Sequence, residues 1–450
     1  MLYKKIDPGS TDCVSTAVNH FNIPGTNVGV TKTIFKEFLP LNPVTESPLH
    51  FVIPPSQSEI DLSETVLELN VSMELLDPGM PGAAIPVPPV WVNIQAVNDV
   101  STIQMLGASV FRNVKLDIGG REVFNANNLY AFKAYFDTIL SYSLEAKRTH
   151  LATMGFYEDN LGINNVGGIG YIARRGLFEN GAHAQFVSKF FLDLFNQERY
   201  FINNTQLDLE LHVNRQEFMC FAPNGLPAPF VDMRIRIHSA RLLVAFPELT
   251  DGLSLGIARS LEVKPAIYAI RRSELKTVYL EPGRTEMNVN IFTEIVPRRV
   301  VMGMVANENY TGSFITNPFD FQPYEIEKHH IEYNGIRNPT NDVYMDFANN
   351  HHIMAYYMMM RNCGFAFTNM TNGITPEDYR VRGFTIFTWN LTSNAQNDNC
   401  FELIKPGTTS YHVRFRAAIP AGGVTMIFYA EHDSILKIDK HRQVTSDLTI

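Results

Sequence analysis

Histidines with acidic residues nearby are the first candidates for chemistry in this sequence. His329-His330 follow Glu327, and His351-His352 follow Asp346. Imidazole nitrogens and carboxylate oxygens are ligands that transition metals accept. Adjacent histidines on a strand point to opposite faces, however, and neither pair has the HExxH spacing that places two histidines on one helix face. We therefore predict ordinary interface or surface histidines and no metal site.

Motifs for catalysis or cofactor binding are equally weak. The glycine-rich stretch Gly162 to Gly170 lacks the Lys-Ser/Thr of a phosphate-binding loop and is typical of a flexible surface loop. No GxSxG motif or Cys-His pairing has a supporting context. The four cysteines are Cys13, Cys220, Cys363 and Cys400, and none of them forms a CxxC pair. Such cysteines are typical of reduced thiols in a protein that folds inside the cell. We therefore expect no catalytic residue, no cofactor and no enzyme activity.

Composition limits the remaining functions. A chain of 450 residues and 50.9 kDa predicts two domains of roughly 200 residues. Its 37 Lys and Arg against 46 Asp and Glu give a net charge of −9, which disfavours general nucleic-acid binding. The start MLYKKIDPGSTDC lacks the apolar core of a secretory signal, and no apolar run is long enough to span a membrane. We expect a soluble protein made in the cell interior.

The apolar residues recur mainly at every second position. We therefore expect strands, more than helices, to hold any functional residues in place. This alternation marks strands with one face on a core. Five segments show it: 67–75, 207–213, 231–237, 287–291 and 411–417. Two segments predict helices instead. Asn127 and Asn128 are expected to cap a helix that buries residues from Leu129 to Leu140. Asp342 is expected to cap another, with Tyr344, Phe347, His351, Met354 and Met358 on one stripe.

The two halves of the sequence repeat one another. In each half a strand meets a tight turn, Gly119-Gly120 or Asn334-Gly335, shortly before the helix. A Phe-rich strand follows each helix, at 190–194 and at 384–391. An alternating strand and a closing apolar strand complete both halves. Five correspondences in the same order indicate a duplication.

The duplication predicts an all-β fold, a double jelly roll. We expect two antiparallel eight-stranded sandwiches in tandem, each with an inserted helix. The expected division is an N-terminal arm at 1–29, a first jelly roll at 30–250, a linker at 251–262, a second jelly roll at 263–436 and a C-terminal tail at 437–450.

Blocks of sequence from about Val30 to Arg442 resemble the major capsid proteins of Polinton (Maverick) elements and adintovirus-like viruses. They are specific but structural, and none carries a catalytic residue. The blocks are Asn127 to Tyr135 with Ser141-Tyr142-Ser143 and Ala146-Lys147, Ile295 to Val305, Asn317-Pro318-Phe319, Tyr333-Asn334-Gly335, Tyr429-Ala430-Glu431 and Ile438-Asp439.

The resemblance implies a structural protein of the virion. In that family three copies form a pseudo-hexagonal capsomer, and many capsomers tile an icosahedral shell around double-stranded DNA. The implied partners are further copies of the chain and the penton and minor capsid proteins, without sequence-specific DNA binding. Two other classes stay open, a jelly-roll carbohydrate-binding or viral attachment protein and a cupin-like metalloenzyme. Glycan binding by the lone trimer would favour the first, and a stoichiometric transition metal the second.

The ends and one long loop are the segments we expect to contact partners. Charges nearly cancel in the 1–29 arm, so a neighbouring capsomer or a minor capsid protein is a better partner for it than DNA. The tail is expected to behave in the same way. The loop 144–184 is expected on the capsomer surface or clasped around an adjacent subunit. The pairs Arg271-Arg272 and Arg298-Arg299 are expected to meet acidic groups of neighbouring subunits. Individual interface residues are left unknown.

Overall fold

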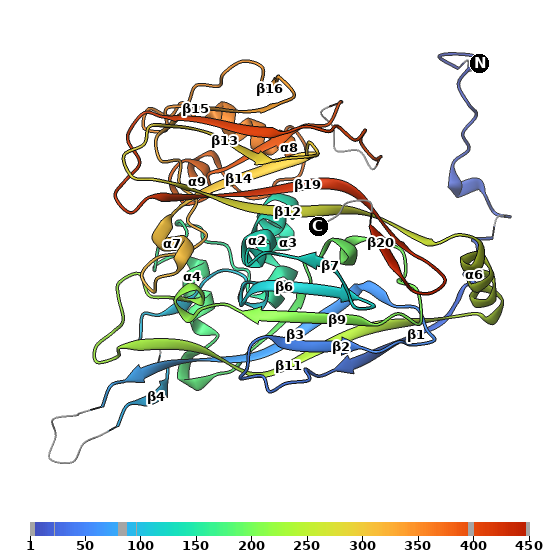
Figure 1. Cartoon of the computed structure of the whole chain (residues 1–450), viewed down its shortest axis with the longest axis horizontal. Coiled ribbons are helices and arrows are strands. Elements are labelled where there is room, and N and C mark those ends of the chain that lie inside the picture. The colour runs from blue at the N-terminus through green and yellow to red at the C-terminus, as the bar shows by residue number, and fades with distance from the viewer. Residues whose placement is uncertain (1–4, 22, 80–87, 96, 395–399, 447–450) are drawn as a thin grey trace.

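The computed structural model describes residues 5–21, 23–79, 88–95, 97–394 and 400–446. Strands dominate, and helices account for about 19% of the chain. The first half and the second half of the chain form two stacked β-sandwiches, the first below and the second above in Figure 1.

Two large antiparallel sheets and the short antiparallel pair β5-β10 make up the first half. One large sheet has the order β1-β11-β3-β4, with β8 also paired to β3, and the other has the order β2-β9-β6-β7. Alternate residues of β2 and β3 are buried between the sheets, which accounts for the period of two in the sequence. The strands are β1 Val30–Phe38, β2 Leu49–Ile53, β3 Asp61–Asp77, β4 Val90–Asn93, β5 Ser101–Thr102, β6 Phe111–Ile118, β7 Arg121–Asn125, β8 Ala184–Lys189, β9 Leu207–Val213, β10 Cys220–Phe221 and β11 Asp232–Leu249.

The second half has the same construction. One sheet has the order β12-β19-β14-β17, with β20 added to β19, and the other has the order β13-β18-β15-β16. The strands are β12 Ala266–Leu280, β13 Glu286–Phe292, β14 Arg299–Ala306, β15 Ile326–Tyr333, β16 Ile336–Asn338, β17 Ile386–Asn390, β18 Thr409–Phe415, β19 Val424–Ile438 and β20 Val444–Ser446.

Strand order is therefore repeated between the halves. The path β1-β11-β3-β8 corresponds to β12-β19-β14-β17, and β2-β9-β6-β7 corresponds to β13-β18-β15-β16. In chain order, a helix stands between the fifth and sixth of these strands in each half, namely α2 and α8. The predicted double jelly roll is confirmed, with eight equivalent strands and an inserted helix in each half. The tight turns are confirmed too, because Gly119, Gly120, Asn334 and Gly335 all have positive φ.

The helices differ from the prediction in several places. They are α1 Leu106–Ser109, α2 Tyr130–Ser141, α3 Leu144–Arg148, α4 Ile169–Gly176, α5 Gln216–Met219, α6 Asp251–Val263, α7 Asn307–Thr311, α8 Ile353–Asn362 and α9 Pro376–Val381, with 3₁₀ turns η1 Thr16–Val18, η2 His150–Met154, η3 Glu179–Gly181 and η4 Asp193–Asn196. The predicted linker contains α6, which the sequence reading missed.

Both predicted helix caps are wrong. Leu129 occupies the N-cap of α2, because Asn127 and Asn128 adopt left-handed turn conformations before it. Asp342 caps nothing, since its carboxylate contacts Lys328 and lies 11 residues before the start of α8 at Ile353. The predicted stripe from Tyr344 to His351 therefore precedes the helix.

One predicted strand is also wrong. Residues 190–192 are buried outside any strand, and Asp193 begins the 3₁₀ turn η4. The strand that occupies this place in the fold is β8, immediately before it. Its counterpart in the second half, β17, lies within the predicted range.

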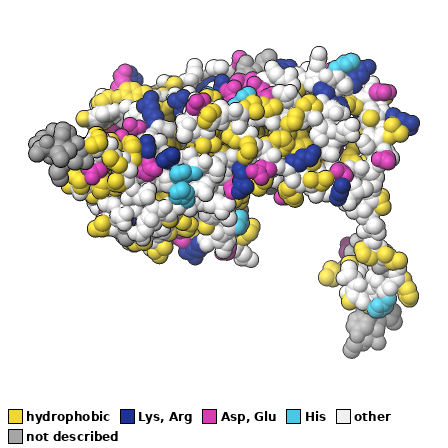
Figure 2. Space-filling view, turned by 90° about the horizontal axis from the view of Figure 1, so that it is seen from below, with side chains coloured by type: hydrophobic (Ala, Val, Ile, Leu, Met, Phe, Trp, Pro, Cys, Tyr) yellow, Lys and Arg dark blue, Asp and Glu magenta, His cyan; other side chains and the backbone are white. Residues whose placement is uncertain are grey.

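The two ends of the chain behave differently. Described residues from 5 to 28 are all exposed, and this N-terminal segment stands away from the body (Figures 1 and 2). The predicted tail is instead packed on its own chain, because β19 extends to Ile438 and β20 folds back to pair with it. Arg442 also donates a 2.7 Å hydrogen bond to Asn203 of the first half. Residues 447–450 lie outside the described residues.

Candidate functional site

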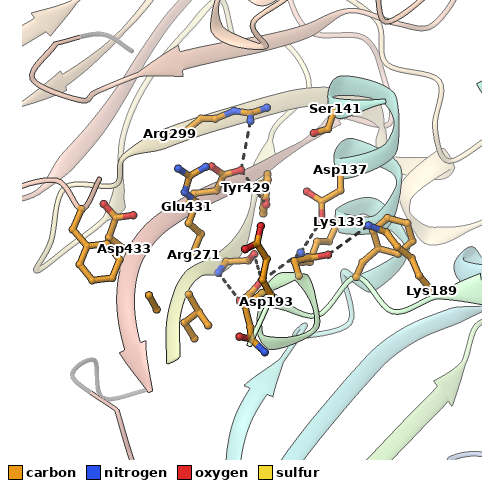
Figure 3. Close-up of a pocket in the computed structure, with 18 of the residues that line it drawn as sticks. Lys133, Asp137, Ser141, Lys189, Asp193, Arg271, Arg299, Tyr429, Glu431 and Asp433 are labelled. Carbon is orange, nitrogen blue, oxygen red and sulfur yellow. Dashed lines mark hydrogen bonds and ion pairs between the residues drawn. The ribbon is translucent and has the colours of Figure 1, made fainter. Parts of the chain in front are cut away.

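A cavity of about 720 Å³ lies between the two jelly rolls. Its walls come from α2 and η4 of the first half and from β12, β14 and β19 of the second (Figure 3). Five basic and five acidic side chains line it, so their formal charges cancel: Lys133, Lys189, Arg199, Arg271 and Arg299, against Asp137, Asp193, Glu198, Glu431 and Asp433. A balanced lining does not attract an anion or a cation by its net charge.

Lys133 forms the centre of this lining. Its side chain is buried, and Nζ lies 2.8 Å from Oδ2 of Asp137 and 3.5 Å from Oδ1 of Asp193. Asp193 also accepts hydrogen bonds from the backbone N–H and the hydroxyl of Ser273, at 2.8 and 2.6 Å. Burial lowers the pKa of Lys133, but the two carboxylates outweigh it and hold that pKa above its ordinary value. Because Ser273 belongs to the second half, this network connects the two jelly rolls.

Arg298 and Arg299, just before and at the start of β14, form a second layer of ion pairs. Arg299 lies opposite Glu431 of β19, with Nη1 3.6 Å from the carboxylate, and Arg298 lies 3.0 Å from Asp433. Burial lowers the pKa of Arg299, and the charge of Glu431 raises it above the ordinary value. These acidic partners belong to the same chain. The predicted pairing of Arg298-Arg299 with a neighbouring subunit is therefore wrong.

Aromatic side chains fill the junction on the other side of α2. Tyr135 stacks on Phe319 with ring centroids 4.2 Å apart, and Phe136 packs on Phe321 at 5.1 Å. The rings of Phe132 and Phe319 meet edge to face at 5.7 Å. Aromatic pairs of this kind contribute about 0.5–1.5 kcal/mol each beyond their buried area. Helix α2 thus binds the second half through a charged face and an aromatic face.

The segment 144–184 is packed, not a free loop. It contains α3, η2, α4 and η3, and it buries Tyr171, Arg174 and Phe178. Its contacts with the second half are backbone and side-chain hydrogen bonds. They join Leu144 to Thr371, Ile163 to Arg382, Asn160 to Arg382 and Asn164 to Asp320. The segment is therefore a clasp within one chain and not the flexible loop predicted at 162–170, while its place on the capsomer surface or against an adjacent subunit stays a prediction.

Lys147 anchors this clasp beside a smaller cavity of about 160 Å³. The side chain is buried, and Nζ donates to the carbonyl oxygens of Ile139 and Asn372 at 2.6 Å each. Burial lowers its pKa to about 7. The second carbonyl belongs to the loop after α8, so this amine also crosses the junction.

Neither cavity has the arrangement of a catalytic site. No histidine is among the described residues that line them, so no serine or cysteine there is paired with an imidazole base. Gly252 to Gly256 has the GxSxG spacing but lies inside α6, where the N–H of Ser254 donates to Thr250 as in any helix. Glycines in a nucleophile motif would instead form a sharp strand-to-helix turn.

His329 and His330 point to opposite faces of β15, as the strand geometry predicts, whereas His351 and His352 lie just before α8 and outside any strand. The prediction of interface or surface histidines is wrong for His329 and His352, because both are buried within the chain. His329 points into the core, where its Nδ1 lies 3.2 Å from the hydroxyl of Tyr411, and burial lowers its pKa to about 3. His330 occupies the opposite face of β15. His352 stacks on Phe347, whereas His351 is exposed. The proposed acidic companions are engaged elsewhere, since Glu327 pairs with Arg414 and Asp346 with Arg416.

Sequence reasoning missed the residues of the junction. Lys133 and Asp193 each interrupt a run of aromatic and aliphatic residues, AFKAYF and FFLDLF. A charge inside such a run is the available signal, because buried charges occur where a partner neutralises them. It shows that a partner exists but does not identify it.

One curated protein places the chain in a family. The uncharacterized protein F54H12.2 of Caenorhabditis elegans is 33% identical over 349 residues, which are 77% of this chain and 81% of that protein. The chain belongs to the same family as this nematode protein. No protein-family model matches the sequence.

Solved structures with the same fold include viral major capsid proteins. The Sputnik virophage structure matches with a TM-score of 0.66 and 14% identity, over 100% of this chain and 95% of that chain. The PBCV-1 capsid matches at 0.58 and 11%, over 96% and 100%. The mavirus major capsid protein matches at 0.55 and 10%, over 100% and 97%. The chain therefore has the double jelly-roll fold of these proteins over its whole length. No helix in the described ranges is long and apolar enough to cross a membrane.

Proposed function

We propose that this chain is the major capsid protein of a Polinton-like virus or element and that it functions by assembly. The repeated strand order carries the proposal, because one chain supplies two similar sandwiches. Three chains around a three-fold axis then present six similar sandwiches, which is the outline of a pseudo-hexagonal capsomer. The whole-chain likeness to the virophage and mavirus structures supports the same function.

A capsomer of this kind requires a fixed orientation of the two sandwiches. The charged network at Lys133, the stacked rings of Tyr135 and Phe319 and the clasp at Lys147 all cross the junction. Packed interiors have few alternative arrangements, so contacts of this type hold two bodies rigidly. Each chain thus acts as one tile with two similar ends.

Apolar side chains reach the surface around the first strand of each half. Phe35, Leu39 and Leu41 are exposed on and after β1, and Ile267 and Tyr279 are exposed on β12. Figure 2 shows hydrophobic side chains spread between charged ones over one face of the molecule. Stable protein interfaces bury about 1,200–2,000 Å², and obligate ones bury more. Burial between neighbouring chains would remove such side chains from water.

Further features support the finer parts of the proposal. A 33% identical relative in an animal is expected if the gene belongs to an element carried in animal genomes. The net charge of −9 disfavours general DNA binding, so in this proposal the shell encloses double-stranded DNA without binding a particular sequence. In this proposal the protein resides in the virion, contacts further copies of itself and penton and minor capsid proteins, and catalyses no reaction.

The solution mass of the purified full-length chain tests the proposal. Light scattering after size exclusion should give a trimer, three times 50.9 kDa or 152.7 kDa, with a three-fold outline under negative stain. Closed shells at higher concentration are the further expected result. A protein that stays monomeric at micromolar concentration and forms no particles with its minor proteins would contradict it. Glycan binding by that monomer would then support the attachment-protein alternative.

A further inference from the structure

Two histidines lie directly opposite each other on the outer face of the sheet β13-β18-β15-β16. His330 of β15 is the register partner of His412 of β18, and their rings stack in parallel with centroids 4.7 Å apart. Glu332 follows two residues along β15 and so projects from the same face. His412 Nε2 lies 4.0 Å from Oε2 of Glu332. Three side chains with metal-ligating atoms thus converge on one surface spot.

The ring of His330 is oriented for a ligand. Its Nδ1 lies 3.5 Å from Oδ1 of Asp342, while Nε2 is buried and has no hydrogen-bond partner. The whole residue is only 7% exposed. A carboxylate on one ring nitrogen orients the imidazole and directs the lone pair of the other nitrogen toward a metal. The unpartnered Nε2 is otherwise a costly feature, because a buried polar atom without a partner loses its hydration.

The spacing of the donor atoms suits one ion. One donor atom from each of His330, Glu332 and His412 can be chosen so that all three lie within 4.8 Å of one another. Zinc binds imidazole nitrogen at about 2.0–2.1 Å and carboxylate oxygen at about 2.0–2.2 Å, so small rotations close the set around one ion. The side chains of His412 and Glu332 are 27% and 39% exposed, which leaves them free to make these rotations.

Basic groups surround the three side chains, but two of these basic groups form ion pairs with carboxylates. Lys328 lies 3.2 Å from Asp342, and Arg414 lies 3.1 Å from Glu327. Arg337 is the register partner of Glu332 on β16. The local charge therefore does not exclude a divalent cation.

We propose that His330, His412 and Glu332 form a binding site for a divalent transition metal of the zinc class, with Asp342 as the positioning residue for His330. Two imidazoles and one carboxylate favour such ions over Ca²⁺ or Mg²⁺, which prefer all-oxygen ligands. The ligands lie on the outer face of the sheet, away from the core between the sheets. The ion crosslinks β15 and β18 and leaves one coordination position open to solvent or to a neighbouring chain. The proposal departs from the expectation of no metal site, and the titration below decides between them.

Titration with cobalt tests the site, because tetrahedral Co²⁺ with nitrogen and oxygen ligands gives visible absorption bands. Full-length protein made without a histidine tag and stripped with EDTA should bind one Co²⁺ per chain, and Zn²⁺ should displace it. His412 and Glu332 are the more exposed ligands, so the variants His412→Gln and Glu332→Gln should still fold. Each variant should abolish the cobalt absorption bands. Asp342→Asn should weaken the affinity by roughly 10–100-fold.

A second stacked pair gives the matched control. The rings of His183 and His238 in the first half stack with centroids 4.1 Å apart. Within the described ranges, only the set at His330 brings three ligand-bearing side chains within 4.8 Å of one another, so the pair at His183 has no third ligand. His238→Gln should leave the cobalt bands unchanged. Equal binding by wild type and His412→Gln would show an adventitious ion and overturn the proposal, as would no binding at 100 μM Co²⁺. Neither result bears on the capsid function, which the solution mass tests separately.

Discussion

The Nζ atom of Lys133 lies 3.5 Å from Oδ1 of Asp193, inside the junction between the two jelly rolls. Asp193 accepts two hydrogen bonds from Ser273 of the second half. A buried lysine of the first half is thus connected to the second half through one carboxylate. The relative orientation of the sandwiches, which the proposed capsomer requires, depends on this connection.

Lys133→Ala should destabilise the chain by about 3–5 kcal/mol, because it leaves the buried carboxylate of Asp193 and the partly buried carboxylate of Asp137 without their cation. Denaturant unfolding followed by tryptophan fluorescence and circular dichroism measures the loss. Lys115→Ala is the matched control, since Lys115 is partly exposed and lies 3.9 Å from Glu210. That exposed pair should contribute no more than about 1 kcal/mol. Equal unfolding midpoints for the two variants would show that Lys133 does not hold the junction.

The alternating segments were predictable from the sequence because local geometry alone produces them. Leu67, Leu69, Val71 and Met73 occupy one face of β3 and are buried there. The order of such segments also revealed the duplication. Strand alternation depends only on residues two apart, so no tertiary information is needed to read it.

The errors arose where a tertiary contact overrides a local signal. Asp342 is a good helix cap by type, but Lys328 and His330 of β15 engage its carboxylate. Phe190 to Leu194 has the composition of a strand, but Asp193 must turn toward Ser273. The junction partners lie far apart in sequence, 60 residues for Lys133 and Asp193 and 225 residues for Lys147 and Asn372, and no local pattern connects them.

Gly303→Ala should lower the free energy of unfolding by about 1–3 kcal/mol, because the added methyl group overpacks the core. A Cβ atom at Gly303 would stand 2.3 Å from Cδ1 of Phe321, and that ring packs on Phe136 of the first half. Thermal and denaturant unfolding measure the loss. Gly256→Ala in exposed helix α6 is the control, because its Cβ meets nothing within 4 Å. Gly256→Ala should raise the free energy of unfolding by about 0.4–1 kcal/mol. A similar gain for Gly303→Ala would disprove the close packing of Gly303 against Phe321.

Acid should destabilise the second jelly roll through His329. Burial lowers the pKa of His329 in the folded state to about 3, below its unfolded value of about 6.5. The unfolded state therefore binds more protons below pH 6.5, so this contribution to stability is present above that pH and is lost as the pH falls. Between pH 7 and pH 5, His329 should therefore lower the free energy of unfolding by about 2 kcal/mol.

Comparison with His329→Phe isolates this effect in denaturant titrations at both pH values. Other groups change the total, since burial raises the pKa of Glu59 to about 7 and gives it the opposite dependence on pH. The variant should lose less stability than the wild type between pH 7 and pH 5. An identical loss in both proteins would exclude His329 as the source.

Limited proteolysis should spare the segment 144–184 equally in the monomer and the trimer, because its clasp joins two parts of one chain. Replacing Lys147 by Ala removes its two carbonyl contacts, and Asn164→Ala removes the bond to Asp320. The double variant should be cut within this segment at least tenfold faster than the wild type. Protection that appears only after trimerisation would instead restore the clasp on an adjacent subunit.

Deleting residues 1 to 25 should leave folded trimers but impair shell assembly. Described residues of this segment are all exposed, and the backbone bond from Thr250 to Gly29 lies beyond the deletion. Apolar side chains such as Phe21 and Ile23 are 96% and 85% exposed, so a neighbouring capsomer or a minor protein is the partner that would bury them. Light scattering should show an unchanged trimer mass, and electron microscopy should show few closed particles. Replacing Phe21 and Ile23 by Ser in the full-length chain should reproduce the assembly defect, whereas normal particles from the truncated chain would refute this role of the arm.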